Sequence, residues 1–178
     1  MTTYLSGQEP DFWDPRPSEM THRNALGNTA HASPSNPPLI AICMNPSYAD
    51  EGRADRTVNR LIDASRAHGY SGWIMLNLYP ERSTNPSGLS AFDPVISAAN
   101  CAAIERVLSE YEATEVLGAW GFLSRATLRR AKVDVLATLK RLDVRLFSFA
   151  NPTADGEPRH PLPRDGSNPL MGNKRYLT

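Results

Sequence analysis

The chain has 178 residues, with 19 Lys and Arg against 19 Asp and Glu, so its formal net charge is zero. This length suits one domain with a single core, and a neutral chain lacks the overall basic field of tight, nonspecific nucleic-acid binders. No run approaches the roughly 18 apolar residues of a membrane span, and two cysteines, Cys43 and Cys101, provide neither a disulfide framework nor a zinc spacing.

The first 38 residues are rich in proline, serine, asparagine and histidine, a composition typical of loops. We expect residues 1–38 to form an extension or an edge element, and residues 39–178 to form a single α/β domain. The start of the chain lacks the basic region and apolar stretch of a secretory signal. We therefore expect a cytoplasmic protein with no membrane contact and no evident protein partner.

From residue 39 onward, short apolar runs alternate with segments of helical periodicity. The apolar runs predict buried strands at 39–44, 73–78, 114–120 and 144–149. The helical spacing predicts helices at 56–68, 94–110 and 123–141, with Asp55 and Asp93 as N-terminal caps. Strand–helix–strand units with short connections imply right-handed crossovers and parallel strands. The predicted fold is a three-layer α/β/α sandwich with a four-stranded parallel sheet.

Ligands of such sheets bind beyond the carboxyl ends of the strands, where this chain has loops rich in polar residues. Asn45 follows the first strand and offers both a hydrogen-bond donor and an acceptor. It either positions a water or a ligand edge, or starts a turn before Pro46. Asn77 interrupts the second apolar run, and a buried amide without partners costs about a few kcal/mol. It therefore either meets a ligand or bonds to a neighbouring loop.

Charged residues in the same loops are further candidates. His160, in the last loop, can donate a proton or a hydrogen bond to an anion near neutral pH. One of the first-loop acids, Asp50, Glu51 or Asp55, can activate a water molecule. Arginines near these loops can hold a phosphate; they are Arg53, Arg56, Arg60 and Arg82. The sequence has no phosphate-binding P-loop, dinucleotide fingerprint, nucleophile elbow or metal-binding motif.

An ordered set of short motifs resembles the bacterial family known as domain of unknown function 1643. The resemblance extends from about residue 37 to about residue 165. The main motifs are Asn45-Pro46-Ser47, Asp55-x-Thr57, Asn77-Leu78, Trp120-Gly121 and Gly156-x-Pro158-x-His160-Pro161-Leu162. This resemblance indicates a family but implies no reaction.

A shorter resemblance is to the uracil-DNA glycosylase-like superfamily. Asn45-Pro46 is similar to a motif that holds water after strand one, and Asn77 to an asparagine that reads the base. His160-Pro161 is similar to a motif whose histidine stabilises the departing base, although Leu162 stands where a serine is usual. The resemblance implies a four-stranded parallel sandwich in which Asn45, with Asp50, positions the attacking water.

These features favour a nucleobase-recognising protein, and one hypothesis is an N-glycosylase that hydrolyses a base–sugar bond without metal or cofactor. Its ligand would be a nucleobase, a nucleotide or a nucleic acid with a flipped base. Further expected ligand contacts are Ser47, Tyr48, Tyr79 and Arg82, with a tyrosine as the stacking face. Two alternatives remain: a hydrolase of free nucleosides or nucleotides, and a non-catalytic module that binds a nucleotide or a modified base.

Overall fold

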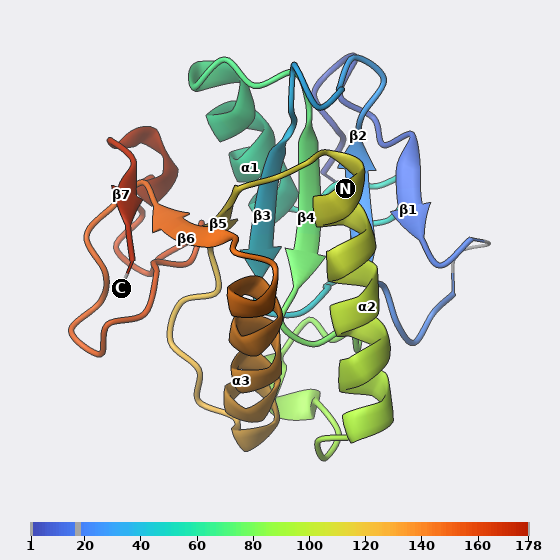
Figure 1. Ribbon diagram of the computed structural model, residues 1–178, viewed down its shortest axis with the longest axis vertical. Helices are drawn as coiled ribbons and strands as arrows, with labels where there is room; N and C mark the ends of the chain where they lie inside the picture. The colour runs from blue at the N-terminus through green and yellow to red at the C-terminus, as the bar shows by residue number, and fades with distance from the viewer. Residues whose placement is uncertain (1, 17–18, 178) are drawn as a thin grey trace.

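The computed structural model describes residues 2–16 and 19–177, which form a mixed α/β fold with one sheet (Figure 1). The strands are β1 (Phe12–Asp14), β2 (Ala25–Asn28), β3 (Leu39–Cys43), β4 (Trp73–Asn77), β5 (Glu115–Gly118), β6 (Arg145–Ser148) and β7 (Arg175–Tyr176). The α-helices are α1 (Arg56–Ala67), α2 (Pro94–Glu110) and α3 (Ala126–Arg141), and two short 3₁₀ helices cover Pro86–Gly88 and Pro169–Met171.

The sheet has the strand order β1-β2-β4-β3-β5-β6-β7. The four predicted strands, β4, β3, β5 and β6, are neighbours and pair in parallel, which confirms the central part of the prediction. The predicted strand number of four is wrong, because β1, β2 and β7 extend both edges in antiparallel pairing. These edge strands have two to four residues each and no apolar run, so the sequence pattern that marks buried strands is missing from them.

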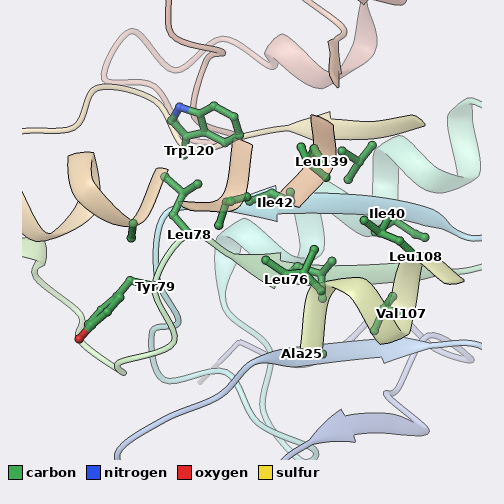
Figure 2. Packing of buried hydrophobic residues seen from close by; sticks show 14 of the residues in the cluster. Ala25, Ile40, Ile42, Leu76, Leu78, Tyr79, Val107, Leu108, Trp120 and Leu139 are labelled. Atoms are coloured by element: carbon green, nitrogen blue, oxygen red, sulfur yellow. The ribbon is translucent and has the colours of Figure 1, made fainter. Parts of the chain in front are cut away.

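Both faces of the sheet are covered, which explains why the central strands are continuous apolar runs. On one face, Ile40 and Ile42 pack with residues of α2 and α3, and Figure 2 shows this cluster with Leu76 and Leu139 among its members. On the other face, Leu39 and Ala41 pack with α1 and with segments from both ends of the chain. Figure 1 shows α2 and α3 in front of the sheet and α1 behind it.

The helix starts follow the predicted capping residues. The Asp55 carboxylate accepts a hydrogen bond from the Val58 N–H at 2.8 Å, and Asp93 accepts from the Val95 N–H at 2.8 Å. Because the four parallel strands run in the same direction, the loops that follow β3, β4, β5 and β6 gather at one edge of the sheet. In the described part of the chain, none of the helices has the length and apolar character of a membrane span.

A buried asparagine joins α2 to the end of β4. Asn100 is fully buried, and its Nδ2 donates to the carbonyl oxygens of Asn77 at 2.9 Å and Leu78 at 3.2 Å. These two carbonyls lie where the strand turns into the loop at the functional edge. Asn100 therefore satisfies buried backbone groups that the sheet does not pair.

We predict that Asn100→Asp lowers the free energy of unfolding by about 3 kcal/mol or more, because a buried acceptor then faces two carbonyl oxygens. Ala99→Asp is the matched control, since residue 99 is exposed on the same helix. It should cost less than about 1 kcal/mol, mostly through helix propensity. Urea unfolding of both variants is the measurement, and equal losses would contradict this role for Asn100.

Candidate functional site

A cleft of about 440 Å³ opens at the carboxyl edge of the sheet, on the side covered by α1. Its floor contains Cys43 and Met75, the former from β3 and the latter from β4. The loops after β3, β4 and β6 and the start of α1 supply its walls. The full lining is Cys43, Met44, Asn45, Ser47, Asp55, Thr57, Met75, Ser83, Thr84, Pro86, His160, Leu162 and Arg164.

Two glycines allow the loop that carries His160 to approach the sheet. A Cβ atom on Gly118, the last residue of β5, would lie 2.9 Å from Cγ of Pro158. A Cβ on Gly121 would lie 2.8 Å from Cβ of His160, and Gly121 has a φ of +70°, a conformation that favours glycine. The Gly121 N–H also donates to the Pro158 carbonyl at 2.9 Å. The motifs around Gly121 and Pro158 are thus the two halves of one packing contact.

A half-buried acid in the same loop, Glu157, also ties the loop to Trp120 and to α3. The Trp120 indole Nε1 donates to Oε2 of Glu157 at 2.6 Å, and the Lys132 ammonium forms an ion pair with Oε1. Trp120 is almost fully buried, and Glu157 is largely shielded from solvent. A charge-assisted contact of this kind is shorter and stronger than a neutral hydrogen bond. Two sets of contacts therefore position the loop of His160: the packing on Gly118 and Gly121, and the bonds of Trp120 and Lys132 to Glu157.

The backbone contacts of the His160 ring favour the neutral tautomer that carries its proton on Nε2. The backbone N–H of Leu162 donates to Nδ1 at 3.1 Å, so Nδ1 acts as the acceptor. Burial lowers the pKa of His160, and this outweighs the opposite effects of the Leu162 contact and the Asp55 charge. The ring therefore presents an Nε2–H donor at neutral pH, and His160 lines the cleft.

Asp55 is the carboxylate of the cleft. Its side chain is only 6% exposed, and it lines the cleft while Oδ1 caps α1. A helix N-terminus favours negative charge. The second carboxylate oxygen is not needed for the cap. The prediction of Asp55 as a helix cap is confirmed, and the same residue brings a charge to the cleft.

Asn45 joins two of the cleft loops. Its Nδ2 donates to the carbonyl oxygens of Pro46 at 3.0 Å and Ser83 at 2.9 Å, so the loop after β4 is fixed to the loop after β3. Within the described residues, nothing donates to its Oδ1, which remains available to a ligand or a water. The structural and ligand-binding interpretations of Asn45 thus apply to different atoms of one amide.

Asn77 lies next to the cleft and does not line it. The residue is fully buried at the end of β4 and pairs in register with Cys43, a floor residue. Its Nδ2 donates to the Arg23 carbonyl at 3.4 Å, whereas its Oδ1 has no partner among the described groups. The structure therefore brings Asn45, Ser47 and His160 to one cleft, with Asn77 buried next to it.

Other predicted site residues lie elsewhere. Tyr79 is fully buried on the opposite face, and its hydroxyl accepts from the Asp93 N–H at 3.1 Å, so no ring face is open for stacking (Figure 2). Tyr48 is 42% exposed and is absent from the lining. The guanidinium of Arg82 donates to the carbonyls of Tyr48 at 3.3 Å and Ala49 at 3.1 Å, which secures the first loop.

Asp50 is committed to its own loop and does not line the cleft. Its carboxylate accepts from the N–H groups of Gly52 and Arg53 and forms an ion pair with the Arg53 side chain at 2.6 Å. Partial burial raises the pKa of Asp50, but these contacts outweigh it and hold the pKa below its ordinary value. Asp55, rather than Asp50, is thus the first-loop acid that meets the cleft.

Arg23 supports the cleft floor and was not predicted from the sequence. It is 4% exposed, and its guanidinium donates to the Ala49 carbonyl, the oxygen that Arg82 also contacts. Burial and the Arg82 charge lower the pKa of Arg23 to about 10. In the described chain, no carboxylate oxygen lies within 4 Å of this guanidinium. No local pattern marks the residue, because its partners are 26 and 52 positions away.

The residues described by the structure contain no group of three His, Cys, Asp or Glu side chains arranged for a metal ion. The groups available for chemistry in the cleft are thus an imidazole donor, a carboxylate, an amide oxygen and hydroxyl groups. Thr57 and Thr84 add hydroxyls that were not among the predicted site residues. Arg164 adds a positive charge at the rim.

The fold and the cleft define an α/β protein whose polar site lies at the carboxyl edge of a mainly parallel sheet. The chain belongs to the family described as "Protein of unknown function (DUF1643)", whose model matches residues 23–162. The match includes the Asn45, Asp55 and His160 motifs and begins at Arg23. No curated protein matches the chain, and no solved structure does.

We predict that Gly121→Ala displaces His160. The substitution combines a left-handed backbone, which costs an alanine about 1–2 kcal/mol, with a clash against the His160 backbone and Cβ. Gly156→Ala is the matched control, because Gly156 has a φ of +78° and nothing within 4 Å of the added Cβ. Only Gly121→Ala should shift the imidazole NMR signals of His160. Equal spectra for the two variants would contradict the packing role of Gly121.

We predict a pH dependence of stability from His160. Because the pKa of His160 is lowered in the folded state, the unfolded chain binds a proton at this residue more readily. The stability that the neutral imidazole contributes is therefore lost as pH falls through about 6.5. The stability of His160→Gln should fall less than that of wild type between pH 7.5 and 5.5 in urea titrations. His31→Gln, at an exposed position, should keep the wild-type slope. A wild-type slope in His160→Gln would contradict the burial effect.

Proposed function

We propose that the cleft binds a nucleobase attached to a sugar and that the protein hydrolyses the base–sugar bond. The observation that carries the proposal is the pairing of a neutral imidazole, His160, with a buried carboxylate, Asp55, on one cleft. An imidazole donor and a carboxylate on one cleft can take separate proton-donating and proton-accepting roles.

In the proposed reaction, the bond between the sugar carbon and the base nitrogen breaks, and the base departs with the bonding electrons. Nε2–H of His160 donates a hydrogen bond to the negative charge that develops on the base. The Asp55 carboxylate stabilises the positive charge on the sugar and accepts a proton from the attacking water. The Asn45 Oδ1 accepts a hydrogen bond from the same water, which fixes its orientation. The water oxygen ends on the sugar as a hydroxyl that keeps one proton, and the other proton, first accepted by Asp55, is released to the departed base through solvent.

The similarity of two motifs to those of uracil-DNA glycosylases also supports the proposed hydrolysis. Asn45-Pro46 follows β3 and His160-Pro161 follows β6, an order similar to the water-holding and base-stabilising motifs of that superfamily. The assignment of Asn77 changes, because its amide is buried beside Cys43 and does not line the cleft. We propose that Asn77 supports the floor, and that the hydroxyls of Ser47, Thr57 and Thr84 meet the polar edges of the ligand.

The test is single-turnover release of free base from nucleosides, nucleotides and oligonucleotides that carry normal and modified bases. His160→Gln should slow release by about 100-fold or more, as for the loss of a preplaced transition-state donor, while ligand affinity changes by less than about threefold. Release by His160→Gln at the wild-type rate would remove His160 from the mechanism. Tight binding of a ligand without release by wild type would replace hydrolysis with a non-catalytic binding role.

Asp55→Asn separates the charge of Asp55 from its structural role. Asparagine caps a helix about as well as aspartate, so the variant should fold with near wild-type stability while base release falls by at least about 100-fold. The matched control is Asp93→Asn, which alters the same kind of cap on α2 outside the cleft. Equal rates for Asp55→Asn and wild type would exclude the Asp55 carboxylate from the reaction.

A further inference from the structure

A second cavity of about 640 Å³ continues from the cleft past His160. We call it the adjoining groove. It shares His160, Leu162 and Arg164 with the cleft, together with Met44 and Pro86, so the two cavities adjoin each other. Pockets for small ligands usually have about 300–1,000 Å³. The cleft is already in this range, and the adjoining groove therefore offers room for more ligand than one nucleoside.

The adjoining groove combines an exposed aromatic ring with positive charge. Phe122 is 63% exposed, directly after the glycine that contacts His160. Arg159 and Arg164 also line the groove, and its lining includes no carboxylate. The next residue in the chain, Asp165, uses its carboxylate to accept from the N–H and hydroxyl of Ser167.

Both arginines can reach a ligand. Arg164 is exposed and has no hydrogen-bond or ion-pair partner in the described chain. The Arg159 Nε donates to the Asn151 carbonyl at 3.2 Å, and its charge also helps to lower the pKa of Asp165, although the two side chains form no ion pair within 4 Å among the described residues. Guanidinium groups bind phosphate oxygens through paired donors.

We infer that the adjoining groove binds the nucleotide next to the recognised base, so that the substrate is a single-stranded oligonucleotide rather than a free nucleoside. The neighbouring base stacks on Phe122, and the linking phosphate lies against Arg164 and Arg159. Single-strand binding sites combine aromatic stacking with a basic groove in this way. The inference rests on the proposed function, since it extends the same site from His160 outward. The zero net charge of the chain is compatible with it, because the positive charge is local.

The test compares binding of labelled six-nucleotide single strands of DNA and RNA with binding of the corresponding nucleosides. The oligonucleotide should bind at least about tenfold more tightly than the nucleoside. Phe122→Ala should weaken oligonucleotide binding by at least about fivefold and leave nucleoside binding unchanged. Val133→Ala, at a similarly exposed position of α3, is the control and should bind as wild type.

Salt dependence tests the phosphate contact. Arg164→Gln should reduce the slope of log affinity against log salt concentration by about 0.7, the change for one lost phosphate contact on a single strand. Arg66→Gln removes the same charge from the exposed last turn of α1 and should leave the slope unchanged. A preference for the DNA or the RNA strand identifies the sugar that the groove accepts.

The outcomes separate this inference from the proposed function. Binding of nucleosides with no gain for oligonucleotides, or a Phe122→Ala variant that binds strands like wild type, would overturn the groove and leave base hydrolysis standing. Strand binding that depends on Phe122 and Arg164 without release of base would keep the groove and overturn hydrolysis. Equal binding of a duplex, unaffected by Phe122→Ala, would also overturn the single-strand assignment.

Discussion

The contact between the last loop and the end of β5 determines where the histidine of the site lies. Gly118 and Gly121 have no side chain at the points where Pro158 and His160 approach. Trp120 and Lys132 bind the Glu157 carboxylate of the same loop. A larger residue at either glycine would push the loop outward, and the donor on His160 would leave the cleft. The rigidity of this contact gives the imidazole a fixed orientation without help from a ligand.

The two ionisable groups of the cleft, His160 and Asp55, lie in different environments. His160 is partly buried, which lowers its pKa, and a backbone N–H donates to its Nδ1. Asp55 is buried and lies at the start of a helix, where backbone N–H groups favour negative charge. One imidazole donor and one carboxylate therefore face the same space. This arrangement suits a reaction in which negative charge develops on one fragment and positive charge on the other.

The N-terminal segment contributes to the site through the sheet. β2 pairs with β4, and Arg23, just before β2, reaches under the first loop to the Ala49 carbonyl. Arg82 contacts the same oxygen from the loop after β4. The loop that carries Ser47 is thus held from two separate parts of the chain. The family match, which starts at residue 23, includes this support.

The amino-acid sequence by itself determined the four central strands, the three helices and the caps of α1 and α2, because apolar periodicity and capping are local properties. It also indicated Asn45, Ser47 and His160, since strand-end loops of a parallel sheet share one edge. Only the tertiary structure decided that β1, β2 and β7 complete the sheet, that Asp55 replaces Asp50 as the cleft acid, and that Tyr79 is buried in the core. Short edge strands carry no periodic signal, and which side chain reaches a cleft depends on contacts between residues far apart in the chain. Arg23 and Asn100 act through such contacts, with partners 22 to 54 positions away, and no local pattern reveals them.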